Sequence, residues 1–411
     1  MTDPDDRTPA GLQPWQATVA PIAIAMLGML GPFSIDTPYP SFAHLQTEFA
    51  VDATVTQQLV SSYLLAFAAM SIFHGPISDA VGRRPVMLVS LLAYSVASIA
   101  AIFAPSIGVL IFCRVLQGLS AGGGVIISRT MIRDLYHGAD AQRLMSRVMM
   151  IFGLAPALAP IIGGWLATVG SWRLIFGFLG GLGLLLVGVV IVALPESHPV
   201  ERRTPLSIRA LLGSMAGVVR TARFHRVTWA GAFLFGAYFL YIGSAAIVVV
   251  DLLGQGETDF WKLFLPMIAG FMAGAFVSGR TAGRLSRNRG VAIGIAIQLG
   301  AAALGVVLML APALRTLPWA VIAPAILGFG VSLAFPPIQL AVVDMFPKAR
   351  GAATSIAAFL TLALNALTAG LLAPVITSSL LAMAIAVLGF TILGALFWVW
   401  HLRVDHQVDR Q

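Results

Sequence analysis

The stretch GPISDAVGRRP, from Gly75 to Pro85, separates two long apolar segments with glycines, one carboxylate and two arginines. A related stretch, GRTAGRLSRNR, from Gly279 to Arg289, follows another apolar segment much later in the chain. When the two are aligned without gaps, Arg83 matches Arg287. The sequence has twelve apolar segments, six in each half, and each stretch follows the second segment of its half. This agreement in position predicts a duplicated architecture.

A weaker pair of stretches supports the duplication. IRDLYHGADAQR, from Ile132 to Arg143, resembles VDMFPKARGAA, from Val343 to Ala353. Short basic connections rich in glycine could also resemble one another by chance.

The composition is that of a membrane protein. Of 411 residues, 58% are hydrophobic and 10% are charged, whereas soluble domains carry about 25% charged residues. A membrane helix needs roughly 20 apolar residues, and its backbone must be hydrogen-bonded within the segment. We expect an all-α membrane protein with twelve transmembrane helices in two six-helix halves. The predicted spans are 17–39, 57–78, 86–104, 107–130, 144–167, 172–194, 227–250, 261–282, 291–311, 317–340, 352–375 and 379–401.

The distribution of basic residues predicts the topology. Arginine and lysine concentrate in alternate connections, which is the asymmetry of cytoplasmic loops, and this accounts for the net charge of +8 without any nucleic acid partner. Both termini are expected in the cytoplasm of a bacterium, with the chain in the inner membrane. The predicted organisation is an N-terminal half (1–194), a basic cytoplasmic loop (195–226) and a C-terminal half (227–411). The single cysteine, Cys113, permits neither an intrachain disulfide nor a cysteine metal cluster.

The stretch after the second span has the residues of a conformational gate. Gly75 and Gly82 permit a tight turn and close approach of helices. Asp79 lies beside Arg83 and Arg84, so the cluster could fix helix 2 to a neighbour in one conformation and release it in another. The alternative interpretation is a positive anchor on the cytoplasmic side.

These residues resemble the helix 2–3 signature of the major facilitator superfamily, and the resemblance covers the whole chain. It implies two six-helix halves around a substrate site near the membrane midplane. It also implies that Gly75, Asp79, Gly82, Arg83 and Arg84 form a gating motif that stabilises the outward-facing state.

The fourth predicted span, 107–130, carries RVLQGLSAGGG, from Arg114 to Gly124. An arginine inside a membrane helix is costly and should face a cavity or a partner, and Gln117 shares its helix face. Gly118 and Gly122 allow close helix contact. The alternative is that Arg114 extends to the outer surface. The stretch is similar to the superfamily's R-x-x-Q-G signature, which implies a role for Arg114 in proton coupling.

The fifth predicted span, 144–167, contains GLAPALAPIIGGWL, from Gly153 to Leu166, and combines prolines with glycines. The composition predicts a kink and tight packing. The stretch also resembles the antiporter signature G-P-x-x-G-G, with Ala159 in place of the first glycine. The resemblance implies an antiporter motif that comprises Pro156, Pro160, Gly163 and Gly164.

Asp36, in SIDTPYP, is the one acid of seventeen that falls inside a predicted span, whereas Asp251 and Asp344 lie at helix ends. Burial raises and a nearby arginine lowers the pKa of a carboxyl group, so Asp36 could bind and release protons. We expect it to contact Arg114 directly, through a water molecule or through Gln117 in at least one conformation. The alternative is a solvated carboxylate where helix 1 frays at Pro38 and Pro40. SIDTPYP resembles helix 1 of drug/proton antiporters of the Bcr/CflA type.

Polar side chains within other spans are candidates for the wall of a substrate cavity, although hydrogen bonds between helices explain each of them equally well. They are Tyr63, Tyr238, Tyr241, Gln339 and Asn365.

The resemblance implies a proton-coupled antiporter that exports amphipathic drugs or similar small molecules by alternating access. The alternative is an uptake or facilitative transporter of a small metabolite. An enzyme is disfavoured because no paired catalytic groups occur, and the sequence has no phosphate-binding loop. The expected partners are a small-molecule substrate, protons and the lipid bilayer. We expect a monomer with no metal and no cofactor.

Overall fold

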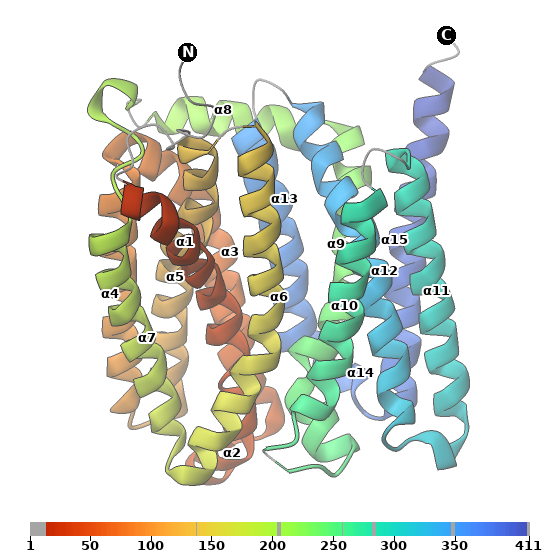
Figure 1. Ribbon diagram of the computed structural model, residues 1–411. Coiled ribbons are helices and arrows are strands. Elements are labelled where there is room, and N and C mark those ends of the chain that lie inside the picture. The colour runs from red at the N-terminus through yellow and green to blue at the C-terminus, as the bar shows by residue number, and fades with distance from the viewer. Residues whose placement is uncertain are drawn as a thin grey trace.

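A computed structural model describes residues 14–136, 138–203, 207–256, 258–281, 285–346 and 350–408. Within these residues the regular structure is entirely helical, as predicted, and twelve long helices form one bundle (Figure 1). The N-terminal half contains α1 (Pro14–Asp36), α3 (Ala53–Val81), α4 (Arg83–Ile102), α5 (Ile107–Leu135), α6 (Gly138–Val169) and α7 (Trp172–Ala193). The C-terminal half contains α9 (Ala222–Gly243), α10 (Trp261–Thr281), α11 (Arg287–Leu310), α12 (Trp319–Met345), α13 (Arg350–Leu367) and α15 (Leu380–Val408).

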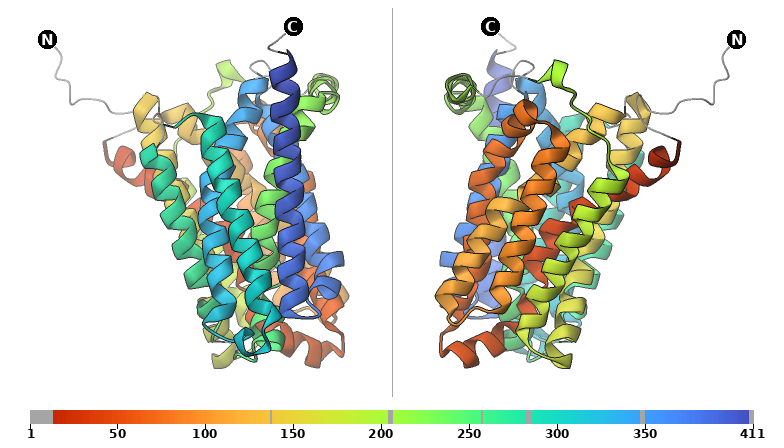
Figure 2. Two further views of the ribbon diagram at one scale, coloured as in Figure 1. Left: turned by 90° about the vertical axis from the view of Figure 1, so that its right-hand side faces the viewer. Right: turned by 90° about the vertical axis from the view of Figure 1, so that its left-hand side faces the viewer.

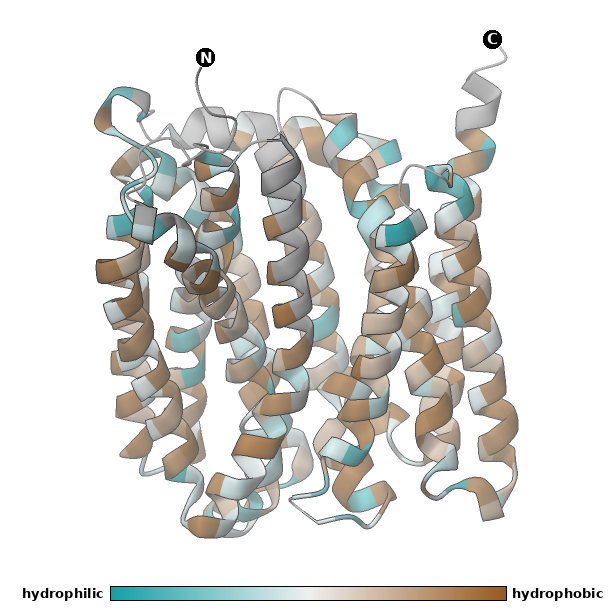
Figure 3. Ribbon diagram, in the orientation of Figure 1, coloured by the Kyte–Doolittle hydropathy of each residue, from teal (hydrophilic) through white to brown (hydrophobic). Residues whose placement is uncertain are grey.

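The helices are membrane-spanning in character. Ten helices of the described chain are long and apolar enough to cross a bilayer. Their middle parts are predominantly hydrophobic, and hydrophilic residues gather toward the ends of the bundle (Figure 3). We call the end at which α1 begins and α15 ends the terminal face, and the opposite end the distal face (Figure 1).

Several short elements interrupt or connect the long helices. On the distal side they are the turn η1 (Tyr39–Ser41), α2 (Phe42–Phe49), the π-helices η3 (Ile247–Leu252) and η5 (Thr368–Leu372), η4 (Pro312–Leu314) and α14 (Ala373–Ile376). The predicted span 17–39 has the right length but lies three residues too far along the chain, because α1 runs from Pro14 to Asp36. Pro38 and Pro40 lack the N–H group that a continuing helix requires. The predicted spans 227–250 and 352–375 likewise pass from α-helix into π-helix near their distal ends.

The connection between the halves is more ordered than the predicted loop 195–226. It contains the turn η2 (Val200–Arg202), the helix α8 (Ile208–Val219) and the first residues of α9. Figure 1 shows α8 lying across the terminal face. Met215 and Val218 of α8 pack into a hydrophobic core shared with α9 and α13. An apolar stripe on an otherwise polar segment thus accounts for the helix that the sequence prediction missed.

The two halves repeat one another in their internal packing. A Cβ atom on Gly118 of α5 would lie 2.3 Å from the backbone oxygen of Tyr63 on α3. In the C-terminal half, a Cβ atom on Gly328 of α12 would lie 2.7 Å from the backbone oxygen of Met267 on α10. In each half, glycine therefore allows the fourth long helix to approach the second closely. This agreement supports the duplication read from the sequence.

The halves meet through α3 with α13 and η5, and through α6 with α10. Near the distal face, the Gln58 Nε2 group donates to the Gly370 backbone oxygen over 3.1 Å. The outer surface of the C-terminal half presents α10, α11, α12 and α15, and that of the N-terminal half presents α4 and α7 (Figure 2).

Candidate functional site

Asp36 is buried at the last residue of α1, and only 2% of its surface is exposed. The solvated alternative is therefore wrong. The chain turns back after Asp36, and Tyr39, Phe42 and Leu45 pack into the core beside it. A Cβ atom on Gly163 of α6 would lie 2.0 Å from the backbone oxygen of Thr37. Close packing of α6 against the end of α1 thus holds the carboxylate inside the protein.

Arg114 on α5 is fully buried, with an exposed fraction of 0%. Its Nε donates to the backbone oxygen of Leu59 over 2.8 Å, and its Nη1 donates to Gln117 Oε1 over 2.9 Å. Gln117 Nε2 donates in turn to Ser98 Oγ over 2.6 Å. The guanidinium lies 4.4 Å from the centre of the Tyr63 ring. Extension of Arg114 to the outer surface is therefore wrong, because these contacts bind the side chain within the N-terminal half.

Asp36 and Arg114 occupy one polar neighbourhood without forming an ion pair in this conformation. The hydroxyl groups of Tyr39 and Tyr63 each interact electrostatically with both charges. Asp36 Oδ1 and Arg114 Nη2 are buried without hydrogen-bond partners. Since an unpaired buried charge is costly, these atoms require partners in another conformation or from solvent. The direct contact between the two side chains stays a prediction.

The C-terminal half places aromatic side chains opposite this cluster. Tyr238 on α9 interacts electrostatically with Asp36 of the other half. The Tyr238 ring stacks on Phe271 with centroids 5.8 Å apart. Phe235 and Phe335 form an adjoining pair at 5.0 Å. A carboxylate on one side of the interface thus faces an aromatic group on the other.

The other cavity candidates are distributed around the C-terminal half. Tyr241 lines a narrow apolar gap with no space for a water molecule, and Gln339 lines a gap of about 10 Å³, which holds one water molecule at most. Neither gap could hold a small-molecule substrate, which needs roughly 300 Å³. Asn365 is buried, and its Oδ1 atom has no hydrogen-bond partner. Tyr63 and Tyr238 thus lie in the neighbourhood of Asp36. Tyr241 and Gln339 line two other places in the C-terminal half.

The predicted antiporter motif lies on α6, which contacts α1 within its half and α10 across the interface. The helix continues through Pro156 and Pro160 to Val169. Pro160, Gly163 and Gly164 are buried. Close packing of this segment is confirmed by the approach of Gly163 to Thr37 described above.

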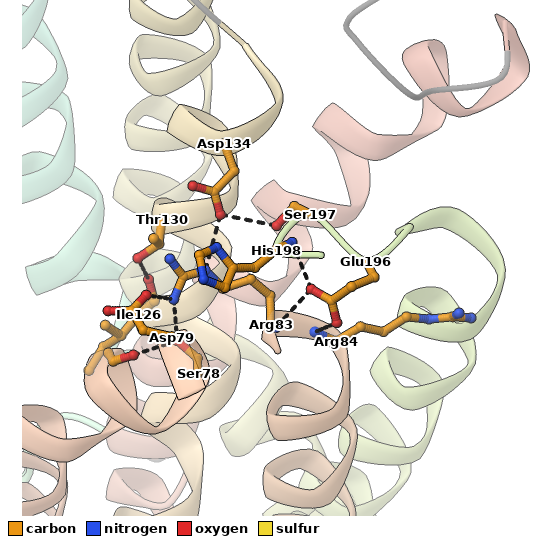
Figure 4. A network of polar contacts seen from close by, with 11 residues as sticks. Ser78, Asp79, Arg83, Arg84, Ile126, Thr130, Asp134, Glu196, Ser197 and His198 are labelled. Atoms are coloured by element: carbon orange, nitrogen blue, oxygen red, sulfur yellow. Dashed lines mark hydrogen bonds and ion pairs between the residues drawn. The ribbon is translucent and has the colours of Figure 1, made fainter. Parts of the chain in front are cut away.

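A second polar network occupies the terminal face of the N-terminal half (Figure 4). Arg83, whose side chain is 6% exposed, forms an ion pair with Asp79. Its Nε donates to Asp134 Oδ2 on α5 over 3.0 Å, and its Nη1 donates to Ser78 Oγ over 2.5 Å. Arg83 on α4 therefore joins two neighbouring helices, α5 through Asp134 and α3 through Asp79. Asp79, which is 44% exposed, supports Arg83 from α3.

Glu196, in the segment after α7, caps the start of α4. Its Oε1 accepts hydrogen bonds from the backbone N–H groups of Arg83 (2.9 Å) and His198 (2.8 Å). Its Oε2 accepts from the backbone N–H of Arg84 over 3.2 Å. A carboxylate suits this place because the first N–H groups of a helix are unpaired and carry partial positive charge. The Ser197 hydroxyl also donates to Asp134 over 3.1 Å, so the connection between the halves is joined to the predicted gating motif.

The two glycines of the motif differ in role. Gly82 has a φ angle of +114°, and a Cβ atom there would lie 2.7 Å from Glu196 Oε2 and from the Arg203 guanidinium. Glycine is therefore required at this turn. A Cβ atom on Gly75 would meet no neighbouring atom within 4 Å, so the close approach predicted for this residue is not made here. Gly75 lies within the continuous helix α3, away from adjoining backbone.

The remaining residue of the motif, Arg84, contacts α7: its Nη2 donates to the backbone oxygen of Ile191 over 2.6 Å.

The C-terminal half carries a simpler copy of the network. Arg287 forms an ion pair with Asp344, and both side chains are about half exposed, at 44% and 52%. The first sequence repeat matches Arg83 with Arg287, and Asp134 and Asp344 each lie near the start of one member of the second pair of stretches. The observed pairing therefore agrees with both repeats.

Sequence reasoning missed Tyr39, Asp134 and Glu196 as members of these clusters. Tyr39 was visible within SIDTPYP, and Asp134 within the second repeat. Glu196 follows the end of an apolar span in LPESH, and an acid at such a basic surface was a usable signal. In the described part of the chain, no group of three or more His, Cys, Asp or Glu side chains could hold a metal ion.

Known proteins resemble this chain in sequence. It is 30% identical to the uncharacterized MFS-type transporter YdgK of Bacillus subtilis over 63% of this chain and 65% of the relative, slightly under two thirds of its length. It is 27% identical to a bicyclomycin resistance protein homolog of Haemophilus influenzae, over 67% of this chain and 70% of that protein. It is 28% identical to multidrug resistance protein D of Escherichia coli, over 81% and 82% of the two chains.

Solved structures agree on the fold. An inward-facing bacterial homolog of the human lysosomal transporter Spinster matches with a TM-score of 0.69 and 16% identity, over 96% of this chain and 98% of that chain. A D-xylose-proton symporter matches with a TM-score of 0.68 and 16% identity, over 94% and 96% of the two chains. Residues 24–369 match the model of the Major Facilitator Superfamily. The chain belongs to this superfamily, and its relatives include transporters of the bicyclomycin-resistance and multidrug-resistance type, as its motifs predicted.

Proposed function

We propose that this multi-pass membrane transporter is a proton-coupled antiporter that exports amphipathic small molecules across a bacterial inner membrane. The observation that carries the proposal is Asp36, a carboxyl group with 2% exposure that interacts electrostatically with Tyr238 of the other half. A carboxylate in such surroundings is costly unless it is paired or protonated. Arg114 would supply the counter-charge that favours the ionised form in a conformation that brings the two side chains together.

The coupling follows because Arg114 and a proton compete for the Asp36 carboxylate. Ionised Asp36 attracts Arg114 and draws the adjoining groups together. A proton on Asp36 removes that attraction and allows the local structure to rearrange. Each form of Asp36 therefore favours a different conformation, so substrate and proton exchange through their effects on one equilibrium.

The terminal face is assigned to the cytoplasm because basic residues concentrate there. The network of Arg83, Asp134 and Glu196 would then act as a cytoplasmic gate, holding α3, α4 and α5 as one unit while the halves move. We retain the division at 195–226, with α8 inside the connection, and a monomer as parts of this proposal.

Everted membrane vesicles that respire in the presence of a pH-sensitive dye would test the proposal. Candidate cationic and neutral drugs would be added one at a time. Antiport predicts that a transported compound raises the pH of the vesicle lumen. Acidification of the lumen on its entry would instead indicate symport, and transport without proton movement would indicate a facilitative carrier.

A further inference from the structure

Four buried polar atoms in the neighbourhood of Asp36 are left without hydrogen-bond partners, and their chemistry is complementary. They are Asp36 Oδ1, the Tyr39 and Tyr63 hydroxyls and Arg114 Nη2. A carboxylate can only accept, a guanidinium can only donate, and a phenol does both. Each side chain is at most 2% exposed. Unpaired buried groups of this kind each cost free energy, so four of them in one neighbourhood indicate a contact made in another state.

Tyr39 is well placed to make that contact. It lies three residues after Asp36, on the turn η1. Its hydroxyl interacts electrostatically with Asp36 and, more weakly, with Arg114. The ring packs edge-on against Phe42 with centroids 5.5 Å apart, so the surrounding core holds its orientation.

Tyr63 is the competing candidate, because its hydroxyl is also unpartnered and interacts with both charges. Its ring face, however, already carries Arg114, with the guanidinium carbon 4.4 Å from the ring centre. Tyr63 therefore contacts Arg114 through its ring and not through its hydroxyl, and the unpartnered Nη2 donor remains for another acceptor.

We propose that the Tyr39 hydroxyl bridges the two charges, donating to ionised Asp36 and accepting from Arg114, and that it releases both when Asp36 takes up a proton. Tyr39 is thus a positioning residue that connects proton binding on α1 to the position of α5. The proposal rests on the coupling role proposed for Asp36. The titratable or charged groups recorded around Asp36 are Tyr39, Tyr63, Arg114 and, from the other half, Tyr238. None of these described neighbours is a second acid.

The test measures protonation of Asp36 without any transport. Purified protein would be treated at a series of pH values with a hydrophobic carbodiimide, which reacts with protonated carboxyl groups in apolar surroundings. Intact-protein mass spectrometry would count the adducts, and Asp36→Asn would give the background. In Tyr39→Phe, loss of a hydrogen bond to the ionised carboxylate should move the half-labelling pH upward by about one unit, a tenfold change in the protonation equilibrium.

Matched variants separate this role from general disturbance. Tyr63→Phe keeps the ring under Arg114, and Tyr136→Phe removes a hydroxyl at the far end of α5; both should stay within about 0.3 pH unit of the parent, well below one hydrogen bond to a charge. Arg114→Gln should also raise the half-labelling pH. The double variant with Tyr39→Phe should shift less than the sum, because both act through one bridge.

A half-labelling pH unchanged by Tyr39→Phe would overturn the proposal, as would an equal shift in Tyr63→Phe. Absence of Asp36-dependent labelling at every pH would also contradict it, because the bridge requires a carboxyl group that titrates. No gradient or substrate is used. A chain that shows the shift but fails to exchange protons for drugs would therefore refute antiport and leave the bridge intact.

Discussion

Replacement of Gly163 by alanine should destabilise the protein at the point where α6 packs against α1. The added Cβ would lie 2.0 Å from the backbone oxygen of Thr37 and 3.0 Å from its carbonyl carbon. Favourable contacts between heavy atoms need about 3.5 Å, so α6 and the end of α1 must move apart by on the order of 1 Å. Because the opposing atoms belong to the backbone, rotation of a side chain cannot relieve the overlap.

Overpacking of this kind costs about 1–3 kcal/mol. Alanine recovers roughly 0.5–1 kcal/mol because it restricts the unfolded chain more than glycine does. The two ranges combine to a net loss of about 0–2.5 kcal/mol, with a central value of about 1.2 kcal/mol, close to a tenfold change in the unfolding equilibrium. Asp36 precedes Thr37 directly, so the same displacement should also impair any proton coupling.

Cys113 provides the assay, because it is the single cysteine and is 4% exposed. A thiol-reactive fluorogenic dye would report its exposure as the detergent-solubilised protein is heated. Gly181→Ala on α7 is the matched control, since a Cβ there has no atom within 4 Å. The Gly163 variant should unfold at a lower temperature than the parent, and the Gly181 variant should not. Equal unfolding temperatures for the two variants would refute the reasoning.

Gly82→Ala should destabilise the protein by about 1–3 kcal/mol in the same thermal assay, because its φ of +114° is unfavourable for alanine; Gly75→Ala, in open space, should be neutral or slightly stabilising. Asp134→Asn should lower the maximal rate of transport by about tenfold with little change in substrate affinity, the effect of losing a hydrogen bond to a charged group. Asp79→Ala should slow transport less, and a larger effect of Asp79 than of Asp134 in proteoliposomes would contradict the assigned roles. Gly370→Ala should weaken the distal contact between the halves, because its Cβ would lie 2.7 Å from Ser61 on α3; spin labels at the distal ends of α3 and α13 should move apart.

The helical bundle could be predicted because each span must satisfy its backbone within lipid, which leaves few alternatives for long apolar segments. The end of α1 was placed late because the length needed to cross a bilayer fixes a span only to within a few residues, whereas the missing N–H groups of Pro38 and Pro40 decide where the helix stops. Helix α8 was missed because its short apolar face is explained only by packing against α9 and α13. The sequence does not reveal that these helices lie beside it.

The candidate site was predictable where a charged residue interrupts an apolar segment of the sequence. Asp36 and Arg114 are charges in apolar spans, so their burial followed from the sequence together with the need for partners. Tyr39 was not distinguishable in this way, because an unpaired phenol is recognised only from its neighbours in space. Glu196 was missed because it acts on backbone N–H groups that are distant in the sequence.

Proton movement driven by a transported compound in everted vesicles tests the central claim most directly, when the parent chain is compared with Asp36→Asn at equal expression. The account predicts that the compound raises the lumenal pH with the parent chain and leaves it unchanged with the Asn variant, although the variant should retain part of its substrate binding. An equal rise in pH with both proteins would contradict the assignment of proton coupling to Asp36.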